Sequence, residues 1–186
     1  MQYNMDRPPF VESEFAGGRW PWQDIVDNIF DHKSRLLFNG LLMTQPGAAE
    51  QEWHADGEHL FPGSGLLNKP HCINVLVPLV EMTAEKGATQ FCKGSHTLTE
   101  KAGEEIVWQD VDHKERIGVT EEPLQPEYDV GDVLLFDYRL LHRAVSNPTE
   151  HGRPVLYFTH AKQWFSDAHN FPTERSLHER STNGHV

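Results

Sequence analysis

Residues 128–142 read Tyr128-Asp129-Val130-Gly131-Asp132-Val133-Leu134-Leu135-Phe136-Asp137-Tyr138-Arg139-Leu140-Leu141-His142. This apolar run starts among turn-forming residues and delivers a histidine near its end, which is typical of a β-strand. A turn signal follows at 146–149, and a second apolar run begins at Arg153. The two runs therefore predict a β-hairpin.

The register of this hairpin decides which side chains share a face. A turn centred between Pro148 and Thr149 sets Val155 opposite His142 and makes Arg153 a diagonal neighbour of His142. Both side chains would then lie on one side of the hairpin, roughly 7–8 Å apart by backbone spacing. A shift of one residue would move Arg153 to the opposite face.

Short apolar runs bounded by Gly, Pro, Asn and Asp recur along most of the chain, as strands and turns do. The expected strands are Arg35–Thr44, His71–Val80, Gly87–Cys92, Val130–Ala144 and Pro154–His160. Helical periodicity occurs only near the start, over residues 21–32, where Pro21 suits the first turn. This order of elements predicts a mainly β protein, a sandwich or a barrel, with an N-terminal helix.

The length favours a single domain that spans residues 1–186. Its β core is expected over 35–171. Residues 103–128 are rich in charged side chains and contain two prolines, so we expect an exposed insertion there. Residues 175–186 are polar with almost no apolar content, and this pattern indicates a flexible tail.

Composition excludes several classes of partner. A formal net charge of −12 without a cluster of Lys and Arg argues against nucleic-acid binding. No apolar run approaches the ~20 residues of a membrane-spanning helix. The N-terminus shows no secretory pattern, so a cytoplasmic location is expected. Cys72 and Cys92 are too few for a disulfide framework and are expected to be buried thiols. The expected partner is a small molecule.

One pair of residues has the spacing of metal ligands. His54 and Asp56 are two apart, so on an extended backbone both side chains leave from the same face. With His142 they would form a set of two histidines and one carboxylate. This set leaves open positions on one side of the metal, as in non-haem iron(II) enzymes that activate oxygen. The residues alone would also suit manganese, zinc or nickel.

Five segments occur in a characteristic order. They are Gln51-Glu52-Trp53-His54-Ala55-Asp56, Pro78-Leu79-Val80-Glu81-Met82-Thr83-Ala84-Glu85-Lys86-Gly87-Ala88-Thr89, Lys93-Gly94-Ser95-His96, Gly131-Asp132-Val133-Leu134-Leu135-Phe136 and Arg153-Pro154-Val155-Leu156. Through them the chain resembles the phytanoyl-CoA dioxygenase family of iron(II)- and 2-oxoglutarate-dependent oxygenases, from Leu36 to about Phe171. The resemblance implies a double-stranded β-helix, the cupin-like jelly roll, with residues 21–32 packing against it.

The resemblance also implies the roles of single residues. His54, Asp56 and His142 would bind iron(II), and Arg153 would pair with the distal carboxylate of 2-oxoglutarate, a contact that suits the guanidinium fork. A carboxylate ligand at Asp56 argues against halogenation, because a halide would need its coordination position.

Two further residues are implied to contact the co-substrate. Gln51 would lie close to the metal and 2-oxoglutarate, and Thr89 occupies a strand position that can contact 2-oxoglutarate. The chain departs from the family at Ala144, where members often carry a small hydroxyl residue, so one expected hydrogen bond is missing or supplied elsewhere. Many members are also longer at the N-terminus.

The activity implied is hydroxylation, or another oxidation, of a small organic substrate such as a natural product or a lipid-like molecule. O2 would be consumed, and succinate and CO2 released. One alternative is a cupin-like metal-dependent isomerase or lyase, which would not need Arg153. Another is a non-catalytic domain that binds a metal or a small ligand. The sequence leaves open the substrate, the site of oxidation and the oligomeric state.

Overall fold

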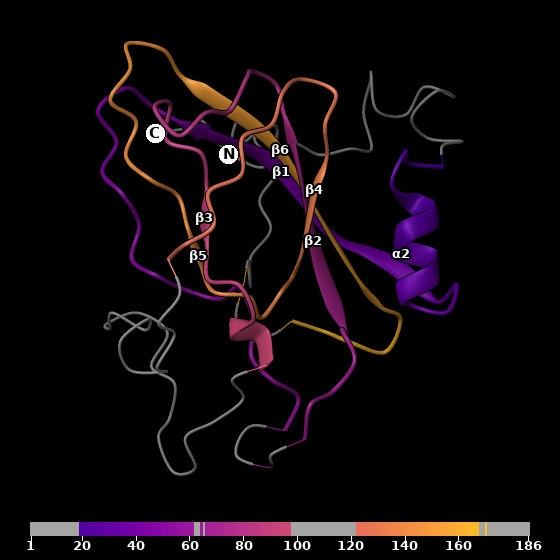
Figure 1. The fold of residues 1–186 in the computed structure, drawn as a ribbon. Helices are drawn as coiled ribbons and strands as arrows, with labels where there is room; N and C mark the ends of the chain where they lie inside the picture. The colour runs from indigo at the N-terminus through magenta and orange to yellow at the C-terminus, as the bar shows by residue number, and fades with distance from the viewer. Residues whose placement is uncertain (1–18, 62–63, 65, 98–121, 168–169, 171–186) are drawn as a thin grey trace, which may run out of the picture.

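The computed structural model describes residues 19–61, 64, 66–97, 122–167 and 170 (Figure 1). The predicted tail at 175–186 and residues 103–121 of the predicted insertion lie outside this set. The end of that insertion, residues 122–128, packs against the core: Tyr128 forms a β-bridge with Met82 and is buried. The expectation of an exposed segment is therefore wrong for Tyr128.

Two antiparallel sheets make up the described fold. The larger has the strand order β1-β6-β2-β4, and the smaller pairs β3 with β5. The elements are α2 (Gln23–Ile29), β1 (Ser34–Thr44), β2 (Cys72–Pro78), β3 (Gln90–Phe91), the 3-10 turn η1 (Ser95–Thr97), β4 (Leu134–Asp137), β5 (His142–Arg143) and β6 (Arg153–Lys162). Figure 1 shows β3 and β5 side by side, across from β2 and β4. The mainly β prediction is confirmed.

Strand β2 separates two apolar cores because successive side chains of a strand point to opposite faces. Ile73 and Val75 pack on the side of α2. Leu76 points the other way and packs with Phe91 of β3 and Phe136 of β4, between the two sheets. The core between the two sheets therefore lies next to β5, the strand that carries His142.

Helix α2 lies within the predicted range 21–32 but is shorter. Val26 and Phe30 are fully buried in the core that this helix shares with the larger sheet. Asp31 and His32 follow with positive φ angles of 54° and 57°, so the backbone leaves the helical conformation there. Among the described residues, no helix is long and apolar enough to cross a membrane.

The predicted strand Val130–Ala144 is in fact two short strands, β4 and β5, separated by a turn. In that turn the buried guanidinium of Arg139 donates to both carboxylate oxygens of Asp137, at 2.8 Å each, and to the Asn68 carbonyl at 3.2 Å. These bonds hold the pKa of Asp137 below its usual value against the opposing effect of burial. The ion pair thus fixes a bend that apolar periodicity did not reveal.

The predicted hairpin between His142 and Arg153 is wrong. Strand β5 pairs with β3, whereas β6 pairs with β1 and β2. Arg153 lies opposite Thr44, and Val155 lies opposite Leu42. The two strands that carry His142 and Arg153 therefore belong to different sheets.

The segment between β5 and β6 shows why no hairpin forms. Its backbone bonds to residues 47–51 instead of turning back on itself: Gln51 N–H donates to the Ala144 carbonyl at 2.9 Å, and Gly47 N–H donates to the Asn147 carbonyl at 2.8 Å. The chain therefore crosses from the smaller sheet to the larger one. An apolar run marks a strand but does not identify its partner.

Candidate metal centre

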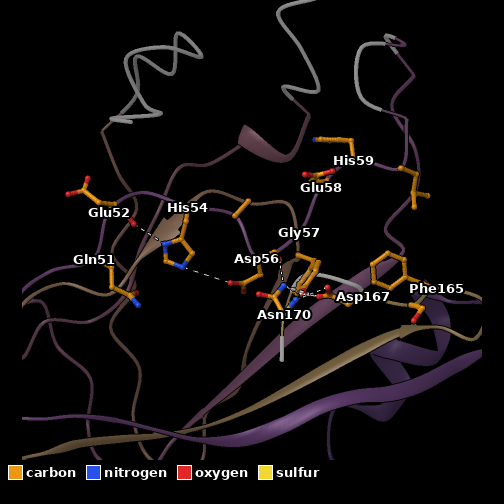
Figure 2. A pocket seen from close by; sticks show the side chains of 14 residues that line it. Gln51, Glu52, His54, Asp56, Gly57, Glu58, His59, Phe165, Asp167 and Asn170 are labelled. Carbon is orange, nitrogen blue, oxygen red and sulfur yellow. Dashed lines mark hydrogen bonds and ion pairs between the residues drawn. The ribbon is translucent and has the colours of Figure 1, made fainter. Parts of the chain in front are cut away.

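The structure brings His54, Asp56 and His142 together. One potential ligand atom from each of the three lies within 4.8 Å of the others. Nε2 of His54 is 3.8 Å from Oδ1 of Asp56, and Nε2 of His142 is 3.6 Å from Oδ2 of Asp56. Figure 2 shows the His54 ring facing the Asp56 carboxylate.

A backbone bridge sets this geometry. His54 and His142 exchange two hydrogen bonds, with N···O distances of 3.0 and 2.8 Å, in an antiparallel bridge. Directly opposed residues place their side chains on one face, and the ring centroids lie 4.5 Å apart. Asp56, two residues after His54, returns to the same face.

Both imidazoles are oriented by backbone carbonyls. Nδ1 of His54 lies 2.8 Å from the Glu52 carbonyl oxygen, and Nδ1 of His142 lies 2.9 Å from that of Leu140. A carbonyl can only accept, so each Nδ1 carries a proton, and Nε2 is the ring atom that faces Asp56. A metal-ligating histidine is commonly fixed by such a bond from its other ring nitrogen.

The surroundings of His142 favour its neutral form. Burial lowers the pKa of this imidazole, and proximity to His54 lowers it further, while the Asp56 carboxylate raises it in part. Its ring packs against Phe91 and Phe136, with centroid distances of 6.0 and 4.8 Å. Neutral imidazole is the form that binds metal ions.

The carboxylate of Asp56 is held by residues that the sequence analysis missed. The side-chain amide of Asn74 donates to Oδ2 of Asp56, and the hydroxyl of Thr159 donates to Oδ1 of Asn74 at 2.7 Å. Asn74 is 5% and Thr159 3% exposed. A sequence signal existed, because Asn74 is the only polar residue in the otherwise apolar β2.

The backbone of Asp56 is held from the other side. The N–H groups of Asp56 and Gly57 both donate to the Tyr138 carbonyl, at 3.1 and 3.2 Å. The side-chain amide of Asn170 donates to the Asp56 carbonyl at 2.7 Å and to the Tyr138 hydroxyl at 2.8 Å. A Cβ on Gly57 would collide with the Tyr138 ring, so this close approach requires glycine.

Two cavities share His54 and Asp56 in their walls. An inner cavity of about 190 Å³ is bordered by the site and by Thr89, Ala144 and Tyr157. An outer cavity of about 690 Å³ is bordered by His54, Asp56, the segments 57–60 and 165–167, and Asn170 (Figure 2). Two imidazoles and a carboxylate that face open space fit a divalent metal with free coordination positions.

Arg153 is buried at the start of β6 and is 5% exposed. Its Nη1 donates to the carbonyls of Lys86, at 2.7 Å, and Gly87, and its Nη2 donates to the Val145 carbonyl at 3.0 Å. These bonds use three of the five guanidinium N–H donors. The Nε–H and one Nη2 hydrogen have no protein partner among the described residues.

Arg153 does not itself border the inner cavity, but a chain of neighbours leads to it. Burial raises the pKa of the Tyr128 phenol, and two neighbours, Thr89, which borders the cavity, and Arg153, offset this effect in part. Among the described residues the phenol oxygen has no hydrogen-bond partner. Burial lowers the pKa of Arg153, and Tyr128 partly offsets this effect. The charged residues of the segment 103–128 indicate an exposed insertion, so its sequence did not predict that Tyr128 would lie near the site.

Gln51 borders both cavities, and its side-chain oxygen accepts from the backbone N–H of Ala144 at 3.0 Å. It thereby ties the segment before His54 to the segment after His142. Ala144 also borders the inner cavity, at the position where a hydroxyl was expected.

Comparison with known proteins places the chain in a family. The sequence model of the phytanoyl-CoA dioxygenase (PhyH) family matches residues 14–155. "Dioxygenase af480" of Aspergillus fumigatus is 31% identical over 147 residues, which cover 73% of this chain and 43% of that protein. The chain thus spans less than half the length of this relative.

Two solved structures share the fold. AviO1 from Streptomyces viridochromogenes Tue57 superposes with a TM-score of 0.64 at 17% identity, covering 89% of this chain and 67% of AviO1. The epimerase SnoN, solved in complex with Fe³⁺, alpha ketoglutarate and nogalamycin RO, has a TM-score of 0.60 at 20% identity, covering 75% of this chain and 54% of SnoN. Because the family match spans well over half of the 186 residues, the chain belongs to the phytanoyl-CoA dioxygenase family.

Proposed function

We propose that this chain is a non-haem iron(II)- and 2-oxoglutarate-dependent oxygenase that oxidises a small organic substrate and releases succinate and CO2. One observation carries the proposal: the two Nε2 atoms and the Asp56 carboxylate converge on one side of a cavity. Family membership supports the choice of iron and 2-oxoglutarate over other metal chemistry.

His54, Asp56 and His142 would hold the iron, which leaves coordination positions for 2-oxoglutarate and O2. When bound, iron(II) supplies O2 activation coupled to the oxidative decarboxylation of 2-oxoglutarate. The protein contributes orientation and exclusion of water. In both imidazoles Nδ1 is bound to a backbone carbonyl, which leaves Nε2 as the atom that would bind the metal.

Arg153 would bind the distal carboxylate of 2-oxoglutarate through its remaining N–H donors. Charge-assisted bonds to a carboxylate are stronger than bonds between neutral groups, and the buried position of Arg153 strengthens them further. Thr89 and Gln51, which border the inner cavity, would contact the co-substrate near its two ends.

The outer cavity would receive the substrate, which we propose to be a natural product. Its volume of about 690 Å³ lies within the usual range for small-molecule sites. Its wall combines the aromatic face of Phe165 with polar groups of Glu58, Ser166 and Asn170, which favours a hydroxyl-bearing molecule over a lipid. The nogalamycin compound in the SnoN complex supports this class.

We further propose a cytoplasmic location. Cys72 and Cys92 are both buried free thiols, as expected in a reducing compartment.

The proposed activity can be tested before the substrate is known. Many enzymes of this type decarboxylate 2-oxoglutarate slowly without substrate, so purified protein supplied with iron(II), O2 and 2-oxoglutarate should form succinate. The variant Asp56→Ala should form none above the rate of free iron. Equal succinate formation by wild type and Asp56→Ala would refute the proposal.

A further inference from the structure

A series of buried side-chain hydrogen bonds connects the middle of the larger sheet to the metal site. Asn74 of β2 and Thr159 of β6 are directly opposed in the β2–β6 register, so their side chains share one face. The Thr159 hydroxyl donates to the Asn74 amide oxygen, and the Asn74 amide nitrogen donates to Oδ2 of Asp56. Three side chains from three segments thus form one line of bonds.

The donors and acceptors determine which end of the Asn74 amide faces Asp56. An ionised carboxylate only accepts, so the amide NH2 of Asn74 must face Asp56. The amide oxygen must then face β6, where only a donor can satisfy it, and the Thr159 hydroxyl is that donor. The Asp56 carboxylate therefore sets the orientation of the amide, and the Thr159 hydroxyl, which can donate or accept, holds the amide in place by donating to its oxygen.

Burying the Asn74 amide costs free energy unless hydrogen bonds offset the loss of water. Asparagine is unfavourable in strands, and a buried amide needs hydrogen-bond partners to offset its desolvation. Every neighbour of Asn74 within β2 is apolar. Among the residues that the structure describes, the amide is bonded to Thr159 and to Asp56 of the metal site.

We infer that Asn74 is a positioning residue: its bond to Oδ2 of Asp56 holds the carboxylate in the orientation that faces the two imidazoles. Without this bond the carboxylate could turn away from the imidazoles, so loss of the amide should weaken metal binding. Thr159 acts one step further out by holding the amide oxygen of Asn74 in place. The inference rests on the proposed role of Asp56 as a metal ligand.

Metal binding in the absence of turnover is the primary test. We would titrate cobalt(II), a spectroscopic substitute for iron(II), into the apoprotein and compare wild type with Asn74→Leu, which preserves side-chain volume without the amide. Loss of an outer hydrogen bond to a ligand typically weakens metal affinity roughly 10- to 100-fold. We expect a loss in this range. We also expect a change in the visible cobalt bands, which report coordination number.

Thr159 supplies a graded second test. Thr159→Val removes the hydroxyl at constant volume and should weaken cobalt binding less than Asn74→Leu does. Thr159→Ser restores a hydroxyl and should recover wild-type affinity and bands. A matched control is Asn147→Ala, because Asn147 is a buried asparagine whose amide bonds to the carbonyls of Thr44 and His151. This control should lower the melting temperature without changing the cobalt bands.

The outcomes separate this inference from the proposed function. If wild type binds cobalt and folded Asn74→Leu binds it with unchanged affinity and bands, the positioning role is wrong and the metal site stands. If Thr159→Val alters the bands and Thr159→Ser does not restore them, the role of the hydroxyl is wrong. If wild type itself binds no metal, the proposed function fails first.

Discussion

His54 and His142 face each other across an antiparallel bridge, each donating its backbone N–H to the other's carbonyl oxygen. The two imidazoles therefore leave the backbone side by side, and their separation depends on the sheet rather than on a flexible loop. The bridge lies at the edge of the smaller sheet, because His142 of β5 pairs with Phe91 of β3 on one side and with His54 on the other.

Replacement of either bridging histidine should abolish stable metal binding. In His54→Ala and His142→Ala, only two ligands remain, so the iron content after anaerobic loading and desalting should fall from about one per chain to near zero. The exposed His151 offers a control, and His151→Ala should retain iron. Full iron content in His142→Ala, measured by mass spectrometry, would remove this residue from the site.

The sequence predicted these three ligands because two of them are local. The spacing of His54 and Asp56 fixes their common face wherever the backbone is extended. The approach of His142 could not be worked out from spacing, since the pairing partner of a strand depends on the whole topology. The resemblance to a family supplied it, whereas the hairpin argument for Arg153 failed.

Two other features were hidden for a physical reason. Tyr128 follows a charged stretch that resembles a surface loop, yet its bridge to Met82 carries it into the core. Asn74 lies in a strand whose apolar character is so clear that a single amide did not alter the prediction. Sequence periodicity reports the average environment of an element and not the exceptions within it.

Gly87→Ala should impair 2-oxoglutarate binding while leaving the metal ligands intact. Gly87 has a φ of +77°, and a Cβ there would collide with the Arg153 guanidinium and the Ser146 carbonyl. We expect the apparent dissociation constant for 2-oxoglutarate to rise at least roughly tenfold, equivalent to about 1.4 kcal/mol.

A matched glycine separates the collision from backbone strain. Gly94 has a φ of +83° with open space where its Cβ would be, so Gly94→Ala bears only the conformational cost of about 1 kcal/mol. It should lose stability and keep its affinity for 2-oxoglutarate. Equal affinities in the Gly87 and Gly94 variants would show that displacing Arg153 has no effect on the co-substrate.

Ala144→Ser should tighten the binding of 2-oxoglutarate. Ala144 borders the inner cavity at the position where a hydroxyl was expected, so serine would add one hydrogen-bond donor toward the co-substrate. A gain of about 0.5–1.5 kcal/mol corresponds to a two- to tenfold lower dissociation constant. Ala144→Cys serves as a control of similar size whose thiol is only a weak hydrogen-bond donor. Equal affinities in the two variants would contradict the expected contact.

Stability should fall in mild acid because of a histidine that lies against Trp22, outside the proposed ligand set. His160 accepts a hydrogen bond from Trp22 at 3.0 Å, and burial lowers its pKa from 6.5 to about 4. The unfolded chain therefore takes up a proton that the folded chain refuses. The stabilisation is present above pH 6.5 and is lost as the pH falls toward 4, by up to about 3 kcal/mol.

Urea denaturation at about pH 7.5 and about pH 5 measures this effect. The variant His160→Gln keeps a side-chain acceptor for Trp22 but does not titrate, so its stability should depend less on pH than that of wild type. His151→Gln, at an exposed position, should keep the wild-type dependence. The same dependence in His160→Gln and wild type would contradict this assignment.

The central claim, that this metal site binds 2-oxoglutarate with Arg153 as its anchor, is tested most directly by anaerobic spectroscopy. We would load wild type and Arg153→Ala with iron(II) under argon, titrate each with 2-oxoglutarate, and record visible absorption. Bidentate chelation of the co-substrate gives a charge-transfer band. We predict this band in wild type and a requirement for at least roughly tenfold more 2-oxoglutarate in Arg153→Ala. An iron-loaded wild type without the band, or an identical titration of both proteins, would contradict the account.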